Sequence, residues 1–147
     1  MMLYLLDTNA VIEALRGNDR MLARLREHLP SAFGLPAIVL HELHFGASKS
    51  HRAKENTARV DALQFEIVAF DREDARKAGE IRAVLAAAGT AIGPYEVLIA
   101  GQALARSLTL VTHNTREFER VPDLKIEDWQ SASRSGGAFK NTAPDSA

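Results

Sequence analysis

The chain has 147 residues and a formal net charge of -1, which is enough length for one domain with a buried core. Its 46% hydrophobic and 25% charged residues are ordinary for a soluble globular protein, and no apolar run approaches the ~20 residues of a membrane span. The near-neutral charge excludes a globally basic nucleic-acid-binding protein, and the absence of Cys excludes disulfides, thiolate metal sites and a Cys nucleophile.

The first predicted element is a buried strand over residues 3–6 that ends at Asp7, where Asp7, Thr8 and Asn9 can cap the helix that follows. A long helix over 72–88 begins at Asp71 and ends at Gly89, and it is expected to face the core with Ala75, Ala78, Ile81 and Leu85. The other expected elements are helices over 10–16, 20–28 (capped by Asp19), 38–47, 53–63 and 95–105, strands over 33–35, 65–70, 109–112 and 124–127, and one helical turn over 116–120.

The alternation of strands and helices predicts a three-layer α/β/α sandwich around a central, mostly parallel sheet. We expect one domain over residues 1–130. Residues 131–147, biased toward Ser, Gly, Ala and Pro, are expected to form a flexible tail because they cannot bury a core. The N-terminus lacks the basic start of a signal peptide, so a cytoplasmic protein without membrane contact is expected.

Three carboxylates stand alone in apolar segments. Asp7 is the only charged residue before Glu13, Glu42 is alone between Glu27 and Lys49, and Glu96 is alone between Arg82 and Arg106. Surface acids on helices usually have charged neighbours three or four residues away, so an isolated acid is expected to point inward. Burying an unpaired carboxylate costs several kcal/mol. A shared bound cation would offset that cost if the fold brings the three acids together.

Oxygen ligands of this kind favour Mg²⁺ or Mn²⁺ over Zn²⁺. Asn114, after the 109–112 strand, should lie on the same sheet edge as Asp7 and can add a neutral oxygen or hold a water. Two simpler interpretations remain open. Asp7 can be only a helix cap, and Glu96, just after Pro94, can be only an acid in the first turn of a helix.

Other motifs are weaker. In His41-Glu42-Leu43-His44 the two histidines are three apart, whereas a zinc protease helix needs a spacing of four. No Gly-rich phosphate loop, dinucleotide fingerprint or nucleophile elbow is present. The basic residues of 49–54, with Arg20, Arg24, Arg26 and Arg82, can grip phosphates, but such a set is more often a solvated face.

With these residues placed, the chain resembles PIN-domain ribonucleases of the VapC toxin type, from residue 3 to residue 129. The segments that carry the resemblance are Leu6-Asp7-Thr8-Asn9, Glu42-Leu43, Ile92-Gly93-Pro94-Tyr95-Glu96 with Leu98-Ile99-Ala100, Val111 to Phe118, Val121-Pro122 and Glu127-Asp128-Trp129.

The resemblance implies a metal-dependent endoribonuclease of a type II toxin-antitoxin system. Such an enzyme cuts tRNA, in close relatives the anticodon loop of initiator tRNA, and so blocks translation. It further implies a homodimer and a VapB-type antitoxin that covers the site. Carried over by position, Asp7 and Glu96 would be metal ligands for Mg²⁺ or Mn²⁺, and Glu42 would hold a water on the metal. Asn114 would take the fourth acidic or amide position, with Thr8, Asn9 and Thr112 as supporting residues.

As a hypothesis, the metal lowers the pKa of a bound water, which attacks the phosphate and leaves a 3′-hydroxyl and a 5′-phosphate. Glu96 departs from the family, which normally has Asp in this context. The extra methylene shifts the carboxylate by about a bond length, where Mg²⁺ demands near-ideal geometry. The alternative function is therefore a weakened or inactivated PIN module that binds RNA or antitoxin without efficient cleavage. A DNA nuclease is disfavoured because the chain is short and lacks further acidic insertions.

Overall fold

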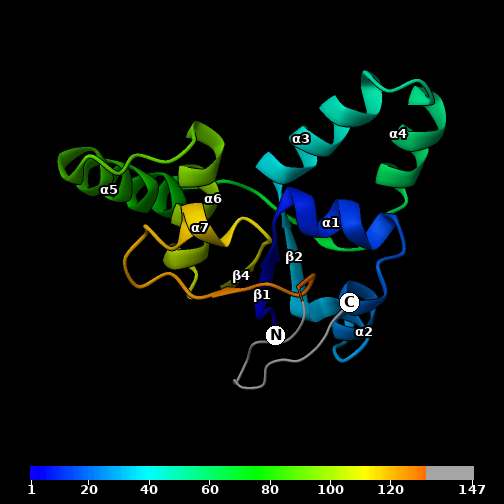
Figure 1. The fold of residues 1–147 in the computed structure, drawn as a ribbon, viewed down its shortest axis with the longest axis horizontal. Helices are drawn as coiled ribbons and strands as arrows, with labels where there is room; N and C mark the ends of the chain where they lie inside the picture. Colours follow the sequence, from blue (N-terminus) through cyan, green and yellow to red (C-terminus); the bar gives the residue numbers. More distant parts are fainter. Residues whose placement is uncertain (132–147) are drawn as a thin grey trace.

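Five parallel strands form the centre of the computed structural model, which describes residues 1–131 (Figure 1). Their order across the sheet is β3-β2-β1-β4-β5. Leu5 of β1 lies opposite Gly34 of β2 and Leu110 of β4. The strand bounds are β1 Tyr4–Leu6, β2 Phe33–Pro36, β3 Glu66–Val68, β4 Thr109–Val111 and β5 Ile126–Glu127. The first strand of the chain is thus the middle strand of the sheet.

Seven α-helices flank this sheet within residues 1–131 and complete the predicted α/β/α sandwich. In Figure 1 the α3–α4 pair and the α5–α6 pair project to opposite sides, and α1 lies below α3 and α4. The helix bounds are α1 Thr8–Leu15, α2 Asp19–Leu25, α3 Ala37–Ser48, α4 Ala53–Asp61, α5 Arg72–Ala88, α6 Pro94–Ala105 and α7 Thr115–Phe118, with a short 3₁₀ turn over Pro30–Ala32. None of the helices in this part of the chain is long and apolar enough to cross a lipid bilayer.

The order and type of the predicted elements are confirmed, and most differences are at their ends. The helix α1 starts at Thr8 rather than at residue 10 because Asp7 itself is the cap. The cap of α2 is Asn18, whose side chain accepts a hydrogen bond from the N–H of Met21. The prediction that Asp19 caps this helix is wrong, since Asp19 is its first helical residue.

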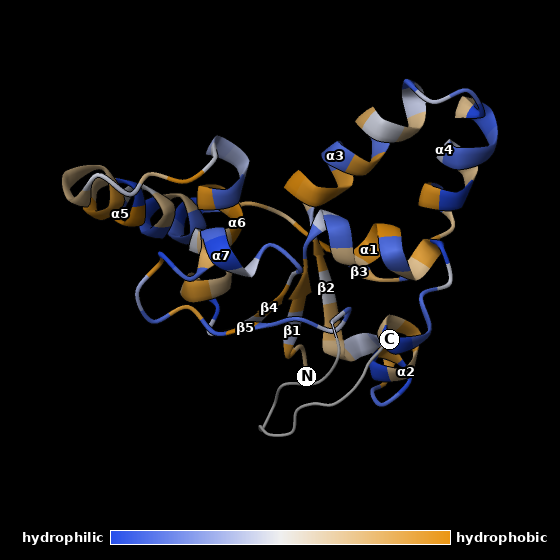
Figure 2. Cartoon of the chain, in the orientation of Figure 1, coloured by the Kyte–Doolittle hydropathy of each residue, from blue (hydrophilic) through white to orange (hydrophobic). Residues whose placement is uncertain are grey.

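The helix α5 has the predicted bounds. Asp71 and Asp74 form a reciprocal capping box at its start, and Gly89 ends it in the left-handed conformation with φ of 73°. In Figure 2 hydrophilic and hydrophobic residues are interspersed along this helix, as its amphipathic pattern predicts. One predicted inward position is wrong: Ala75 is exposed, and Asp74 lies buried with Ala78, Ile81 and Leu85.

Asp74 joins α5 to α6. It is only 1% exposed, and it accepts hydrogen bonds from Gln102 Nε2 at 2.9 Å and from Arg106 Nε at 3.1 Å. The two helices also approach closely at Gly101, where an added Cβ would lie 2.6 Å from the Cα of Ala78. This contact fixes the position of α6, the helix that carries Glu96.

The C-terminal end of the described chain packs against the start of the fold. Trp129 is buried, its Nε1 donates to Glu127 Oε1 at 2.8 Å, and the guanidinium of Arg24 lies 4.6 Å from its ring centroid. Ser131 donates a hydrogen bond to Asp128. The rest of the predicted tail, residues 132–147, lies outside the described residues.

Candidate active site

Asp7 lies at the carboxyl end of the central strand, which is the edge where open α/β sheets bind their ligands. Its backbone N–H continues the sheet by donating to the carbonyl of Val111 at 3.0 Å, so the residue is held by two strands. Its side chain is 6% exposed and accepts a hydrogen bond from the N–H of Thr8 at 2.8 Å. Asp7 is therefore both a helix cap and a buried carboxylate at the ligand edge.

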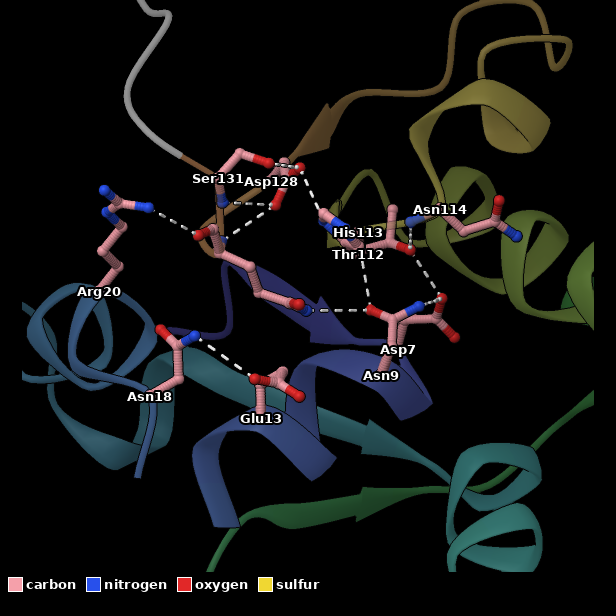
Figure 3. A network of polar contacts seen from close by, with 11 residues as sticks. Asp7, Asn9, Glu13, Asn18, Arg20, Thr112, His113, Asn114, Asp128 and Ser131 are labelled. Carbon is pink, nitrogen blue, oxygen red and sulfur yellow. Dashed lines mark hydrogen bonds and ion pairs between the residues drawn. The ribbon is translucent and has the colours of Figure 1, made fainter. Parts of the chain in front are cut away.

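Neutral donors surround this carboxylate (Figure 3). Thr112 Oγ1 donates to Asp7 Oδ2 at 2.7 Å, and Asn9 Nδ2 lies 3.3 Å from the same oxygen. Asn9 Oδ1 in turn accepts from the backbone N–H of His113 at 2.9 Å, which ties the start of α1 to the loop after β4. The structure thus brings Asn9 and Thr112, two of the predicted supporting residues, into contact with Asp7.

Glu42 reaches the same region from α3. Its Oε1 accepts a hydrogen bond of 2.7 Å from the hydroxyl of Thr8, the residue after Asp7. The side chain is half-buried, in a helix whose neighbouring residues are mostly apolar. Thr8, the third predicted supporting residue, therefore links the carboxylate of Glu42 to the end of β1.

Glu96 is the third residue of α6, after Gly93 as the cap and Pro94 as the first helical residue. Its carboxylate turns back to its own backbone N–H, and its Oε1 lies over Gly93 so closely that no side chain could replace that glycine without displacing it. Glu96 thus fits the first-turn interpretation and still lies within the electrostatic influence of the other acids.

Glu117, in α7, is a fourth carboxylate of this region that the sequence prediction missed. It accepts hydrogen bonds from the N–H of Gly93 at 2.6 Å and from Asn114 Nδ2 at 2.9 Å. These bonds lower its pKa. Asn114 was predicted as the fourth site residue, and the structure places its amide against Glu117. Arg116, Glu119 and Arg120 surround Glu117 in the sequence, so a search for isolated acids passes over it.

The four carboxylates influence one another electrostatically. Burial raises the pKa of Asp7 above its ordinary value, and the charge of Glu42 raises it further, although the bonds from Thr112, Thr8 and Asn9 oppose this. Burial likewise raises the pKa of Glu96, and the charges of Glu117, Glu42 and Asp7 raise it further. Within residues 1–131 none of the four forms an ion pair with a Lys, Arg or His nitrogen.

The donor chemistry suits a hard divalent cation, but the side-chain arrangement is not that of a formed metal site. In the described residues no group of three or more Asp, Glu, His or Cys side chains is close enough to hold an ion. The reason is visible in the contacts, since Glu42, Glu96 and Glu117 each turn toward a nearby donor. Binding a cation between them would require these side chains to give up those contacts.

The other sequence candidates lie elsewhere. His41 is exposed and its ring contacts Tyr95, whereas His44 Nε2 lies 3.5 Å from Asp61, so the two histidines do not share a ligand. Among the basic residues, Arg24 pairs with Glu127 and Arg52 pairs with Glu55. These two arginines support the fold or lie on its solvated face.

The comparison with protein families gives one match, the PIN domain, over residues 4–124. The tRNA(fMet)-specific endonuclease VapC of Salmonella typhimurium is 39% identical over 131 residues, which cover 88% of this chain and 99% of the relative. The protein of the same name from Shigella flexneri is 37% identical, with coverage of 88% and 99%. Among solved structures, DNA-bound VapBC from Salmonella typhimurium superposes with a TM-score of 0.83 at 39% identity and the same coverage.

Proposed function

The chain belongs to the PIN-domain family, and we propose that within it the protein is an endoribonuclease toxin of the VapC type that cleaves tRNA. The proposed substrate is initiator tRNA, because relatives at 37–39% identity are named tRNA(fMet)-specific endonucleases. The proposed cleavage position, the anticodon loop, rests on the resemblance alone. Cleavage there would block translation. The proposed place of action is the cytoplasm, where this substrate is.

The observation that carries the proposal is that the charges of Asp7, Glu42 and Glu117 each raise the pKa of Glu96, and that of Glu42 also raises the pKa of Asp7, while none of the four acids forms an ion pair in the described part of the chain. Like-charged carboxylates near one another are costly unless a proton or a cation neutralises them. We propose Mg²⁺ or Mn²⁺ as that cation, with Asp7 and Glu96 as its ligands. When bound, such an ion activates water and neutralises charge on the phosphate.

The residues around the carboxylates have distinct proposed roles. Thr112 and Asn9 hold the Asp7 carboxylate in one orientation, so that it meets a ligand without reorganising. Thr8 holds Glu42 near the end of β1, and Glu42 is proposed to accept a proton from an attacking water once it turns from Thr8 toward the metal. Asn114 and the N–H of Gly93 fix Glu117 beside Glu96.

Glu96 keeps a second candidate function open. Its longer side chain turns back over Gly93, which an Asp at this position could not do to the same extent. If the carboxylate stays there, the protein is a weakened PIN module that binds RNA or antitoxin without efficient cleavage. Turning this carboxylate toward a ligand would lose its hydrogen bond to the Glu96 backbone.

A VapB-type antitoxin is the proposed protein partner, because the solved relatives from Salmonella typhimurium and Rickettsia felis are VapBC complexes. A homodimer is also proposed, from the resemblance alone. In this scheme the antitoxin covers the carboxylate site until it is removed.

The deciding experiment compares this chain with Glu96→Asp and Asp7→Ala, each freed of antitoxin, on total tRNA with Mg²⁺, with Mn²⁺ and with EDTA. Cleavage by this chain in metal only, with none by Asp7→Ala, supports the toxin and shows that Glu96 is tolerated. Cleavage by Glu96→Asp alone supports the weakened module. No cleavage by any of the three contradicts the tRNase proposal.

The ends of the cleaved RNA test the reaction itself. Hydrolysis by water leaves a 3′-hydroxyl and a 5′-phosphate, which can be mapped by end-specific ligation of the fragments. A 2′,3′-cyclic phosphate would instead mean attack by the ribose hydroxyl, and the roles proposed for the carboxylates would be wrong.

A further inference from the structure

Two exposed aromatic rings from different helices meet beside the carboxylates. The ring of His41, in α3, and the ring of Tyr95, in α6, have centroids 5.4 Å apart and planes inclined by 60°. Tyr95 is 44% exposed and His41 is also exposed, so neither ring is part of the core. Edge-to-face contact of this kind leaves at least one ring face open to a further partner.

Each ring adjoins an acid of the candidate site. His41 directly precedes Glu42, and Tyr95 directly precedes Glu96. The helices α3 and α6 contact each other, and the charge of Glu42 acts on Glu96. The aromatic pair therefore lies next to the candidate carboxylates, where α3 and α6 meet.

An exposed aromatic residue by itself is ordinary on a protein surface. Phe45, one turn after His41 on the same helix, is such a case: it is 61% exposed, and Lys49 Nζ lies 4.8 Å from its ring centroid. Tyr95 and His41 differ from it because two separate helices bring their rings together at the candidate site. Phe45 serves as the matched control.

The negative charge of the candidate site makes a stacking contact useful there. Four carboxylates repel the phosphates of an RNA, and the chain as a whole carries a formal net charge of -1. Stacking on an aromatic ring does not depend on charge, and unpaired bases in RNA loops are commonly held in this way. A ring pair next to the acids can hold a base while the adjoining phosphodiester lies at the carboxylates.

We propose that Tyr95 and His41 form a stacking platform for an unpaired nucleobase next to the scissile phosphate. The inference rests on the proposed ribonuclease function and adds to it a specificity-determining contact. Tyr95 and His41 touch a base that does not react, so they position the substrate and take no part in the chemical step.

The first test measures steady-state cleavage of the RNA that the chain cuts, for Tyr95→Ala, His41→Ala, Tyr95→Phe, Tyr95→Leu and Phe45→Ala. Loss of one stacked base weakens binding by about 5- to 150-fold. Tyr95→Ala and Tyr95→Leu should raise KM by a factor in this range and change kcat by less than about threefold. Tyr95→Phe and Phe45→Ala should behave as the parent chain.

The second test locates the base by equilibrium binding in an Asp7→Asn background, so that the RNA stays intact. Stem-loops of the cleaved RNA carry one abasic site at each loop position in turn. At one loop position the abasic site should weaken binding to the Asp7→Asn chain. The same abasic site should have no further effect when the chain also carries Tyr95→Ala. That loss of coupling is specific to a contact between this ring and this base.

The possible outcomes distinguish failure of the stacking platform from failure of the proposed ribonuclease function. If the chain cleaves RNA but Tyr95→Leu matches it, or no abasic position couples to Tyr95, the stacking platform is wrong and the ribonuclease remains. If Tyr95→Ala lowers the oligomeric mass in solution and RNA binding falls only with it, the ring pair is a contact between protein copies instead. If no RNA is cleaved or bound, both proposals fail together.

Discussion

Two buried aspartates occupy opposite electrical environments in this molecule. Asp74 is 1% exposed and pairs with Arg106, whose Nη2 lies 3.0 Å from Asp74 Oδ2. Asp7 is 6% exposed and accepts hydrogen bonds only from neutral groups, Thr8, Asn9 and Thr112. Burial disfavours the charge of both side chains, but the bonds to Arg106 lower the pKa of Asp74 overall, whereas the pKa of Asp7 is raised.

The difference separates an acid that stabilises the fold from one that is held ready for a ligand. Asp74 also accepts hydrogen bonds from the N–H of Asp71, in the capping box of α5, and from Gln102 Nε2. Burial and the charge of Glu42 disfavour the ionised form of Asp7, and a proton or a cation would remove that cost. Each of the following predictions changes one of these two aspartates or its partner, and they run from the largest expected effect to the smallest.

Asp7→Asn should lower ribonuclease activity by at least about 1000-fold, since metal-ion catalysis contributes several kcal/mol of charge stabilisation in the transition state. Its melting temperature should stay close to that of the parent chain, because removal of an unpaired buried charge offsets the loss of one of the two acceptor oxygens. Activity assays and thermal unfolding of the same preparation test both. Asp61→Asn, at an exposed position, is the control, and a strongly destabilised Asp7→Asn would contradict the comparison.

Arg106→Met should destabilise the fold by about 3 kcal/mol, because it leaves the buried Asp74 without its cation. Urea unfolding at neutral pH measures the loss. Ribonuclease activity at a temperature where the variant is folded should remain, in contrast with Asp7→Asn. The double variant Arg106→Met/Asp74→Leu should regain part of the stability, and a double variant that is less stable than the single one would argue against the pairing.

Mg²⁺ should stabilise the parent chain by about 2.7 kcal/mol at a concentration about 100 times its dissociation constant. Arg106→Met should gain as much, since its carboxylate site is intact, and Asp7→Asn should gain little. Denaturant unfolding over a Mg²⁺ series, with K⁺ at matched ionic strength, measures the gain. Equal stabilisation of Asp7→Asn and the parent chain would mean that Asp7 does not bind the metal.

The pH dependence should have opposite signs at the two aspartates in metal-free protein. The raised pKa of Asp7 means that its contribution to stability is present below the ordinary value of 3.8 and is lost as pH rises through the raised value. The lowered pKa of Asp74 gives stability that is present above 3.8 and is lost as pH falls through the lowered value. Melting temperatures from pH of about 4 to 7 in EDTA should therefore decline less in Asp7→Asn than in the parent chain.

Much of the fold could be predicted because its signals are local. The bounds of α5 follow from Asp71 and Gly89, a cap and a left-handed stop that act within one turn of the helix. The strand order could not be read in the same way. That β1 is central depends on pairing with residues 33–36 and 109–111, far along the chain.

The same limit applies to the candidate site. Asp7, Glu42 and Glu96 were predictable because each is the only charge in an apolar stretch, and the fold does bring them within electrostatic reach of one another. Glu117 and Asp74 were missed because charged residues surround both in the sequence. The environment of Glu117 and Asp74 is set by residues that are distant in the sequence, Gly93 and Arg106.

The sequence by itself determined which segments become strands and helices, because periodicity and caps act over a few residues. Only the tertiary structure decided that Asp74 meets Arg106, that Glu117 joins the site through Gly93, and that Tyr95 meets His41. Those outcomes depend on contacts between residues 24 to 54 positions apart, and no local pattern encodes the distance between them.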